Sequence, residues 1–255
     1  MVDATETTAA LADRLDTART TRTAVPSLTD THRLDVDGAY AVQRALVARR
    51  RARGERLTGV KLGFTSEAKM AQMGVSEVIV GRLTDAMRVT DDGDLALGGL
   101  IHPKVEPEIA YRLGRDVDPG DPTDFLLAAV DAVAPALEVI DSRYRDFRFT
   151  YEDVIADNTS AAAYVLGPWS PPRDLRDLKV VLTSGIQETT GSTSAILGDP
   201  ARALRALRDI CHRRVIPLRA GDVVLAGAAT AAVPLTAGTT RAEVEGLGAV
   251  TVRGV

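Results

Sequence analysis

The sequence is poor in cysteine, in net positive charge and in long apolar runs. A single cysteine among 255 residues excludes an intramolecular disulfide and is typical of a reducing cytoplasm. The 31 Lys and Arg residues are outnumbered by 35 Asp and Glu, so the chain lacks the concentrated positive charge that nucleic acid binding requires. No stretch approaches the roughly 18 apolar residues of a membrane-spanning helix, and residues 1–15 show no signal-peptide pattern. We therefore expect a cytoplasmic protein that binds neither nucleic acid nor membranes.

The single thiol is expected to be structural. Cys211 shares one face of a predicted helix with Leu204 and Leu207. Asp199 and Pro200 begin this helix, as a capping residue followed by a proline at the first helical position. A cysteine on an apolar helical face is more often buried than reactive, so the pattern favours a core residue over a nucleophile.

Helical patterns dominate the first part of the chain, and strand patterns dominate the rest. Apolar spacing predicts helices over about residues 4–20, 38–53, 66–74 and 124–134, the last of them ended by Pro135. Strands are expected at 57–64 and 78–83, and residues 179–190 predict a hairpin that turns at Ser184 and Gly185. This order indicates an α+β fold, with a helical N-terminal region over 1–56 and a strand-rich domain over 57–255.

Two glutamates lie on one face of an expected strand in the segment LIHPKVEPEIAYRL, residues 100–113. Alternate strand side chains share a face, so Glu106 and Glu108 either sit in water at an edge or are held together by a cation. Glu138 lies in a second apolar, strand-like run, where a carboxylate without a partner is costly. Three carboxylates from two strands supply half of an octahedral oxygen shell. Such a set suits Mg²⁺ or Mn²⁺ and leaves positions for water or substrate.

Five blocks of sequence carry a family resemblance. They are GVKLGFTSEAKMAQMGV (59–75), LIHPKVEPEI (100–109), EVIDSRYRDFRF (138–149), ADNTSAAAYVLG (156–167) and AGDVVLAGAATAAVPLTAG (220–238). In their order and spacing the chain resembles, over about residues 38–255, the hydratase/decarboxylase branch of the fumarylacetoacetate hydrolase superfamily. The stretches TSEAKMAQMGV and IHPK favour the decarboxylases of this branch over its hydratases.

The resemblance implies a mixed β-sheet roll that follows the helical N-terminal region in the sequence. Residues 57–255 are then expected to form the catalytic domain. It also implies a divalent metal, Mg²⁺ or Mn²⁺, held by Glu106, Glu108 and Glu138, and a substrate-facing Lys61. The local sequence supports a functional Lys61 as well, because this lysine interrupts an apolar strand, where an ammonium needs an anionic partner.

Further candidate residues come from the polar segments of these blocks. Asp157, Asn158 and Ser160 form a polar stretch, for which turn formation and capping on one side, and a catalytic role on the other, both stay open. Thr230 matches a family position near the substrate carboxylate. His102 is a candidate for a residue that orients the glutamates by contacting them from outside the metal site.

The implied activity is Mg²⁺-dependent decarboxylation of an unsaturated 2-oxo diacid through a dienolate whose charge the metal stabilises. The alternative is a hydratase, or a related lyase of a specialised biosynthetic pathway, because the same dienolate chemistry serves both. A noncatalytic partner subunit is a third class, and the retained carboxylates and Lys61 argue against it. The resemblance also implies a homo-oligomer and a complex with a sister hydratase or decarboxylase.

Overall fold

The computed structural model describes residues 6–66, 70–71, 74–75 and 77–255. The helices are α1 (Thr8–Thr21), α2 (Val36–Ala52), α4 (Thr123–Ala129), α5 (Tyr151–Ala156) and α6 (Pro200–Arg214). The strands are β1 (Leu57–Gly63), β2 (Ile79–Thr84), β3 (Arg88–Val89), β4 (Gly93–Leu95), β5 (Lys104–Leu113), β6 (Val130–Ile140), β7 (Ala161–Leu166), β8 (Lys179–Ser184), β9 (Gln187–Ser192), β10 (Val223–Ala228), β11 (Val233–Pro234), β12 (Gly238–Val244) and β13 (Gly248–Gly254). No helix in these ranges is long and apolar enough to cross a membrane.

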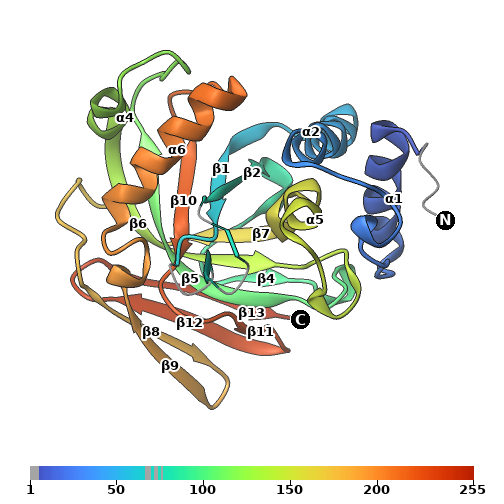
Figure 1. The fold of residues 1–255 in the computed structure, drawn as a ribbon. Coiled ribbons are helices and arrows are strands. Elements are labelled where there is room, and N and C mark those ends of the chain that lie inside the picture. The colour runs from blue at the N-terminus through green and yellow to red at the C-terminus, as the bar shows by residue number, and fades with distance from the viewer. Residues whose placement is uncertain (1–5, 67–69, 72–73, 76) are drawn as a thin grey trace.

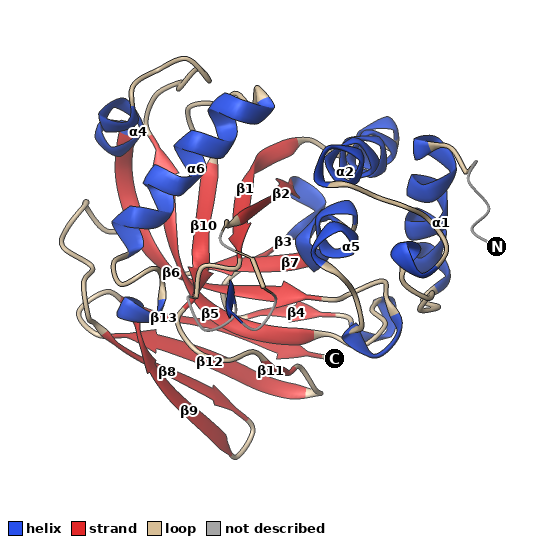
Figure 2. Cartoon of the chain, in the orientation of Figure 1, coloured by secondary structure: helices blue, strands red, loops and turns tan. Residues whose placement is uncertain are grey.

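The strands form two mixed sheets (Figures 1 and 2). The larger has the order β2-β1-β10-β5-β6-β7-β3, with β11 added beside β5, and the smaller has the order β4-β13-β12-β8-β9. Parallel pairs such as β1–β10 occur beside antiparallel ones such as β5–β6. The sheets share an apolar core that includes Val105 and Leu137 of the larger sheet and Ala242 and Val252 of the smaller. The predicted mixed β-sheet architecture of the α+β class is confirmed.

Helices cover the larger sheet in two groups. The amphipathic helix α6 buries Leu204, Leu207 and Cys211 in the core beside β1, β5 and β10, so the expected structural thiol is confirmed. The helices α1, α2 and α5 gather at the other end of the molecule around their own apolar cluster, which includes Leu15 and Ile155 (Figure 1). The division of the chain at residue 56 falls between α2 and β1, and stays a prediction.

Most predicted elements are present. The helices expected over 4–20 and 38–53 correspond to α1 and α2, and the side chain of Asp199 accepts a hydrogen bond from the amide of Ala201 at the start of α6. The hairpin is formed by β8 and β9, and Gly185 in its turn has a left-handed φ of 58°. The short helix expected over 66–74 lies partly outside the described residues.

The helix predicted over 124–134 is wrong in its second half. Helix α4 ends at Ala129, and the chain continues directly into β6, with Pro135 in the middle of the strand. Residues 130–134 are mostly small or β-branched and pair with β5 along one edge. The rest of β6, residues 136–140, pairs with β5 on one side and β7 on the other. Long-range pairing therefore overrides the local helical spacing. The strand-like run expected around Glu138 is the second half of β6, which carries Glu138 to the face of the sheet that holds the other glutamates.

Candidate active site

Three buried glutamates meet on one face of the larger sheet. Glu106 lies directly opposite Glu138 in the register of β5 and β6, and Glu108 lies two residues further along the same face of β5. Their exposed fractions are 6% for Glu106, 1% for Glu108 and 0% for Glu138. Each offers one carboxylate oxygen, and these three atoms all lie within 4.8 Å of one another. The structure thus brings the predicted carboxylates together and rules out the alternative of a solvated edge.

A buried lysine completes this group. The Nζ atom of Lys61, on β1, lies 2.9 Å from a carboxylate oxygen of Glu138 and donates a hydrogen bond of 3.2 Å to the carbonyl of Thr159. Burial by itself would lower the pKa of Lys61, but the three neighbouring carboxylates outweigh it and raise that pKa above its ordinary value. Lys61 therefore carries a positive charge inside the site, as the sequence predicted.

The carboxyl groups of this site repel one another. Burial and the neighbouring carboxylates raise the pKa of Glu108 well above its ordinary value, and burial raises that of Glu138. One oxygen of Glu108 accepts a hydrogen bond of 2.7 Å from the amide of Gly227, but its Oε1 accepts none from the described residues. A divalent cation between the three groups would offset this repulsion and favour their ionised forms. Oxygen-only donors are the ligands that Mg²⁺ and Mn²⁺ prefer.

The carbonyl that accepts from Lys61 belongs to a strained turn. Asn158, Thr159 and Ser160 (η5, Asn158–Ser160) all have left-handed φ values, between 50° and 59°. Three consecutive left-handed residues other than glycine persist only where their surroundings hold them. The amide side chain of Asn158 does so on one side, because it accepts from the amide of Arg82 at 2.7 Å and donates to the carbonyl of Arg82 at 2.9 Å.

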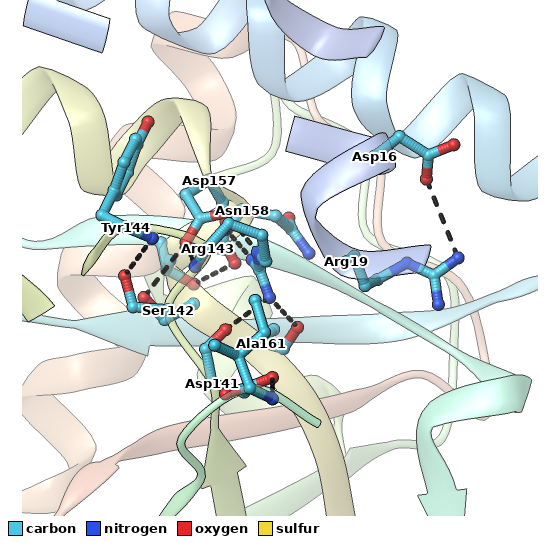
Figure 3. A network of polar contacts seen from close by, with 12 residues as sticks. Asp16, Arg19, Asp141, Ser142, Arg143, Tyr144, Asp157, Asn158 and Ala161 are labelled. Atoms are coloured by element: carbon cyan, nitrogen blue, oxygen red, sulfur yellow. Dashed lines mark hydrogen bonds and ion pairs between the residues drawn. The ribbon is translucent and has the colours of Figure 1, made fainter. Parts of the chain in front are cut away.

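A buried arginine holds the same turn from the other side (Figure 3). Arg143 donates from Nε to the carboxylate of Asp157 and from its terminal nitrogens to the carbonyls of Asp157 and Asp141. Burial raises the pKa of Asp157 to about 6 although Arg143 opposes that shift. Asp157 thus faces Arg143 rather than the glutamates, and Ser160 donates a long hydrogen bond of 3.4 Å to Asp157. Both residues shape the turn, and the catalytic roles predicted for them stay predictions.

Two other candidates form hydrogen bonds with residues other than the glutamates. His102 is wrong as a support for them, since its Nε2 lies 2.7 Å from the carbonyl of Ser142 and its ring packs against Phe147. Thr230 follows β10 and donates from its hydroxyl to the carbonyl of Ala231. Its role near a substrate carboxylate stays a prediction.

Sequence reasoning missed three residues that build this site. Arg143 and Thr159 stood inside the family blocks, but only their contacts reveal what they do. Gly81 lies opposite Lys61 in the β1–β2 pair, and a Cβ atom added there would come within 2.2 Å of the Thr159 hydroxyl. A glycine in a strand interior signals such a close approach of another segment, so this one could have been found from the sequence.

Comparisons with known proteins agree with this geometry. Residues 64–253 match the model of the fumarylacetoacetate (FAA) hydrolase C-terminal family. The chain is 49% identical to a 4-oxalocrotonate decarboxylase from Pseudomonas sp. over 93% of this chain and 94% of the relative. It is 41% identical to a 2-keto-4-pentenoate hydratase from Paraburkholderia xenovorans, strain LB400, over 76% of this chain and 74% of that relative.

A solved structure extends the comparison to three dimensions. The 4-oxalocrotonate decarboxylase from Pseudomonas putida G7, complexed with magnesium and adipate, superimposes with a TM-score of 0.91 at 34% sequence identity. The superposition covers 99% of this chain and 100% of that one. With a family match over most of its length, relatives aligned almost end to end and a shared fold, the chain belongs to the fumarylacetoacetate hydrolase family.

Proposed function

We propose that this protein is a Mg²⁺-dependent decarboxylase of an unsaturated 2-oxo diacid of the 4-oxalocrotonate type. The observation that carries the proposal is the buried group of three carboxylates beside one lysine, whose converging oxygen atoms suit a divalent cation. Similarity to decarboxylases over almost the whole chain supports the reaction type. Glu106, Glu108 and Glu138 would hold Mg²⁺ or, in its place, Mn²⁺.

The metal would act as a Lewis acid toward a 2-oxo acid and favour negative charge on its ketone oxygen. In the reaction, the bond between the distal carboxylate and its carbon breaks and CO₂ leaves. The electron pair then spreads through the conjugated chain to the oxygen of the 2-oxo group, and a proton added to that oxygen gives the 2-hydroxydienoate. Low exposure of the glutamates keeps water away from this charge and strengthens every electrostatic interaction in the site.

Lys61 supplies an ammonium in direct contact with Glu138. The ammonium contacts Glu138 and donates a hydrogen bond to the carbonyl of Thr159. Its position is therefore fixed before a substrate binds. In this position it either neutralises an anionic group of the substrate or transfers the proton that the dienolate accepts. Both roles require the charged form, which the surrounding carboxylates favour.

Hydration of an unsaturated 2-oxo acid is the second candidate, because hydratases are among the relatives at about 40% identity. Product analysis separates the two activities. Purified protein with Mg²⁺ is supplied with 2-oxohex-3-enedioate and, separately, with 2-hydroxypenta-2,4-dienoate. Release of CO₂ from the diacid supports the decarboxylase. Water addition to the dienoate without CO₂ release from the diacid would replace it by the hydratase.

We also propose a homo-oligomer that forms a complex with a sister hydratase or decarboxylase. The support is the resemblance to the hydratase/decarboxylase branch, together with Ile186, a fully exposed apolar side chain at the turn of the β8–β9 hairpin. Light scattering of the protein alone, and after mixing with the sister enzyme, measures both assemblies. A mass of one chain in both experiments would contradict the proposal. The expected cytoplasmic location stays a prediction.

A further inference from the structure

A cavity of about 290 Å³ lies between α2, the first residue of β1, Arg82 of β2 and the C-terminal end of α6. Four arginines from three different elements line it: Arg44 and Arg51 of α2, Arg82 of β2 and Arg214 of α6. This concentration is unusual in a chain whose net charge is −4. We call the space the arginine cavity.

Three of these arginines form no ion pair with the described residues. Arg214 pairs with Asp37 and stacks over the ring of Tyr40 at 4.5 Å from its centroid. For the side chains of Arg44, Arg51 and Arg82, by contrast, the described part of the chain offers neither a hydrogen bond nor an ion pair. Other arginines near the end of α2 are paired. Arg49 pairs with Asp13 and Arg50 with Glu55.

Arg82 is the member that most needs an anion. Burial lowers the pKa of its guanidinium, Asp222 opposes that shift from a distance, and the charge of Arg51 lowers it further. Two guanidinium groups that repel each other in a partly enclosed space favour any anion that enters between them.

Apolar side chains form another part of the lining. They include Val47 of α2, Leu57 of β1, and Ile216 and Pro217 just after α6. Inorganic phosphate would meet the guanidinium groups but leave this apolar lining in water. A ligand that satisfies both parts has separate anionic groups joined by a short hydrocarbon segment, and pockets of this size accept small organic molecules.

The arginine cavity is distinct from the active site. Arg82 lies opposite Val60 in the β1–β2 pair, whereas Gly81 lies opposite Lys61. Since neighbouring residues of a strand point to opposite faces, Arg82 and Lys61 lie on opposite sides of this pair. The cavity and the glutamates are thus separated by the sheet itself.

We propose that the arginine cavity is a second binding site of this protein, for a small aliphatic dicarboxylate. The unpaired guanidinium groups bind the two carboxylates, and the apolar lining covers the hydrocarbon between them. This inference does not depend on the proposed reaction, because the cavity lies on the opposite face of the β1–β2 pair from Lys61.

The test is isothermal titration calorimetry with adipate on metal-free protein at constant ionic strength. The double variant Arg44→Gln/Arg51→Gln should bind adipate at least tenfold more weakly than the wild type. The matched control is Arg205→Gln, which removes an exposed arginine of α6 outside the cavity and should leave the affinity unchanged. Glutamine keeps a helix propensity close to that of arginine, so α2 and α6 should remain folded, as thermal melting will verify.

Several results would overturn the proposal. One is equal affinity in the double variant and the Arg205→Gln control, and another is no adipate binding to the wild type at millimolar concentration. Butyrate should bind at least tenfold more weakly than adipate, and equal binding would exclude a site for two carboxylates. Inorganic phosphate that binds more tightly than adipate would exclude the dicarboxylate class. Decarboxylase activity is measured separately, so failure of one proposal leaves the other standing.

Discussion

At the scale of single residues, Glu106 is the simplest test of the metal site. Glu106→Gln keeps the shape of the side chain but removes one anion from the group of three, so we expect Mg²⁺-dependent turnover to be lost while the fold remains. Repulsion among the carboxylates falls, and the melting temperature without metal should be unchanged or slightly higher. Steady-state assays and melting curves measure both effects. Full Mg²⁺-dependent activity in this variant would refute the assignment.

Glu108 should govern how the stability of the metal-free protein changes with pH. The raised pKa of Glu108 means that, above about pH 4.5, this carboxyl group still binds a proton in the folded protein but has lost it in the unfolded chain. The free energy of unfolding therefore falls as the pH rises from about 4.5 toward the raised pKa. In Glu108→Gln this contribution disappears, while the Gly227 amide keeps an oxygen acceptor. The variant should melt at a higher temperature than the wild type at pH 8 and close to it at pH 4. An identical difference at both values would contradict the raised pKa.

Substitutions of Lys61 test whether its ammonium acts in the reaction or only supports the structure. Removal of its ammonium in Lys61→Ala should lower kcat/KM by at least about tenfold, because even ~1.4 kcal/mol of lost transition-state stabilisation has that effect. Metal affinity should hold or rise, since Glu138 loses its ion pair and becomes available. Lys61→Arg should not restore activity, because a planar guanidinium does not fit the space of a buried ammonium. Near-normal kcat/KM in Lys61→Ala would show that the lysine takes no part in the reaction.

At the scale of elements, the contact between β2 and the turn η5 should decide where Lys61 points. Gly81→Ala would bring a methyl group within 2.2 Å of the Thr159 hydroxyl and 2.7 Å of the Asn158 carbonyl. Overpacking of this kind costs about 1–3 kcal/mol of stability. We expect kcat to fall as well, because the Thr159 carbonyl that orients the ammonium must move.

Gly98→Ala is the matched control for this substitution, since an added Cβ there meets no atom within 4 Å. It should leave both the melting temperature and kcat near the wild-type values. If Gly81→Ala behaves in the same way as Gly98→Ala, the turn adapts without cost and does not position Lys61.

At the scale of the whole molecule, Mg²⁺ should stabilise the fold. A ligand that binds only the folded state at a concentration 100 times its Kd adds about 2.7 kcal/mol of stability, which raises the melting temperature of a chain this long by roughly 5–10 °C. Chelation should reverse the shift. Glu106→Gln should show little or none of it at the same Mg²⁺ concentration. An equal shift in the wild type and the variant would place the stabilising ion elsewhere.

Local sequence patterns determined several features of this protein. The alternation around Glu106 and Glu108 is enough to place both on one face of a strand, because that face depends only on neighbouring backbone geometry. The cap at Asp199 and the turn at Gly185 depend in the same way on a few adjacent residues. The five sequence blocks identified the family, and with it the expectation of a metal and of Lys61.

Only the tertiary structure decided how these parts meet. Glu138 reaches Glu106 because residues 130–140 form a strand in one particular register with β5, and no local pattern encodes that register. The Arg143–Asp157 pair joins segments whose contact no periodicity encodes, and the arginine cavity draws its charges from elements separated by more than 100 residues. Local patterns fix the direction of a side chain relative to its own element. The register and packing of distant elements fix which side chains share a site, since they arise from burial and hydrogen bonding summed over the whole chain.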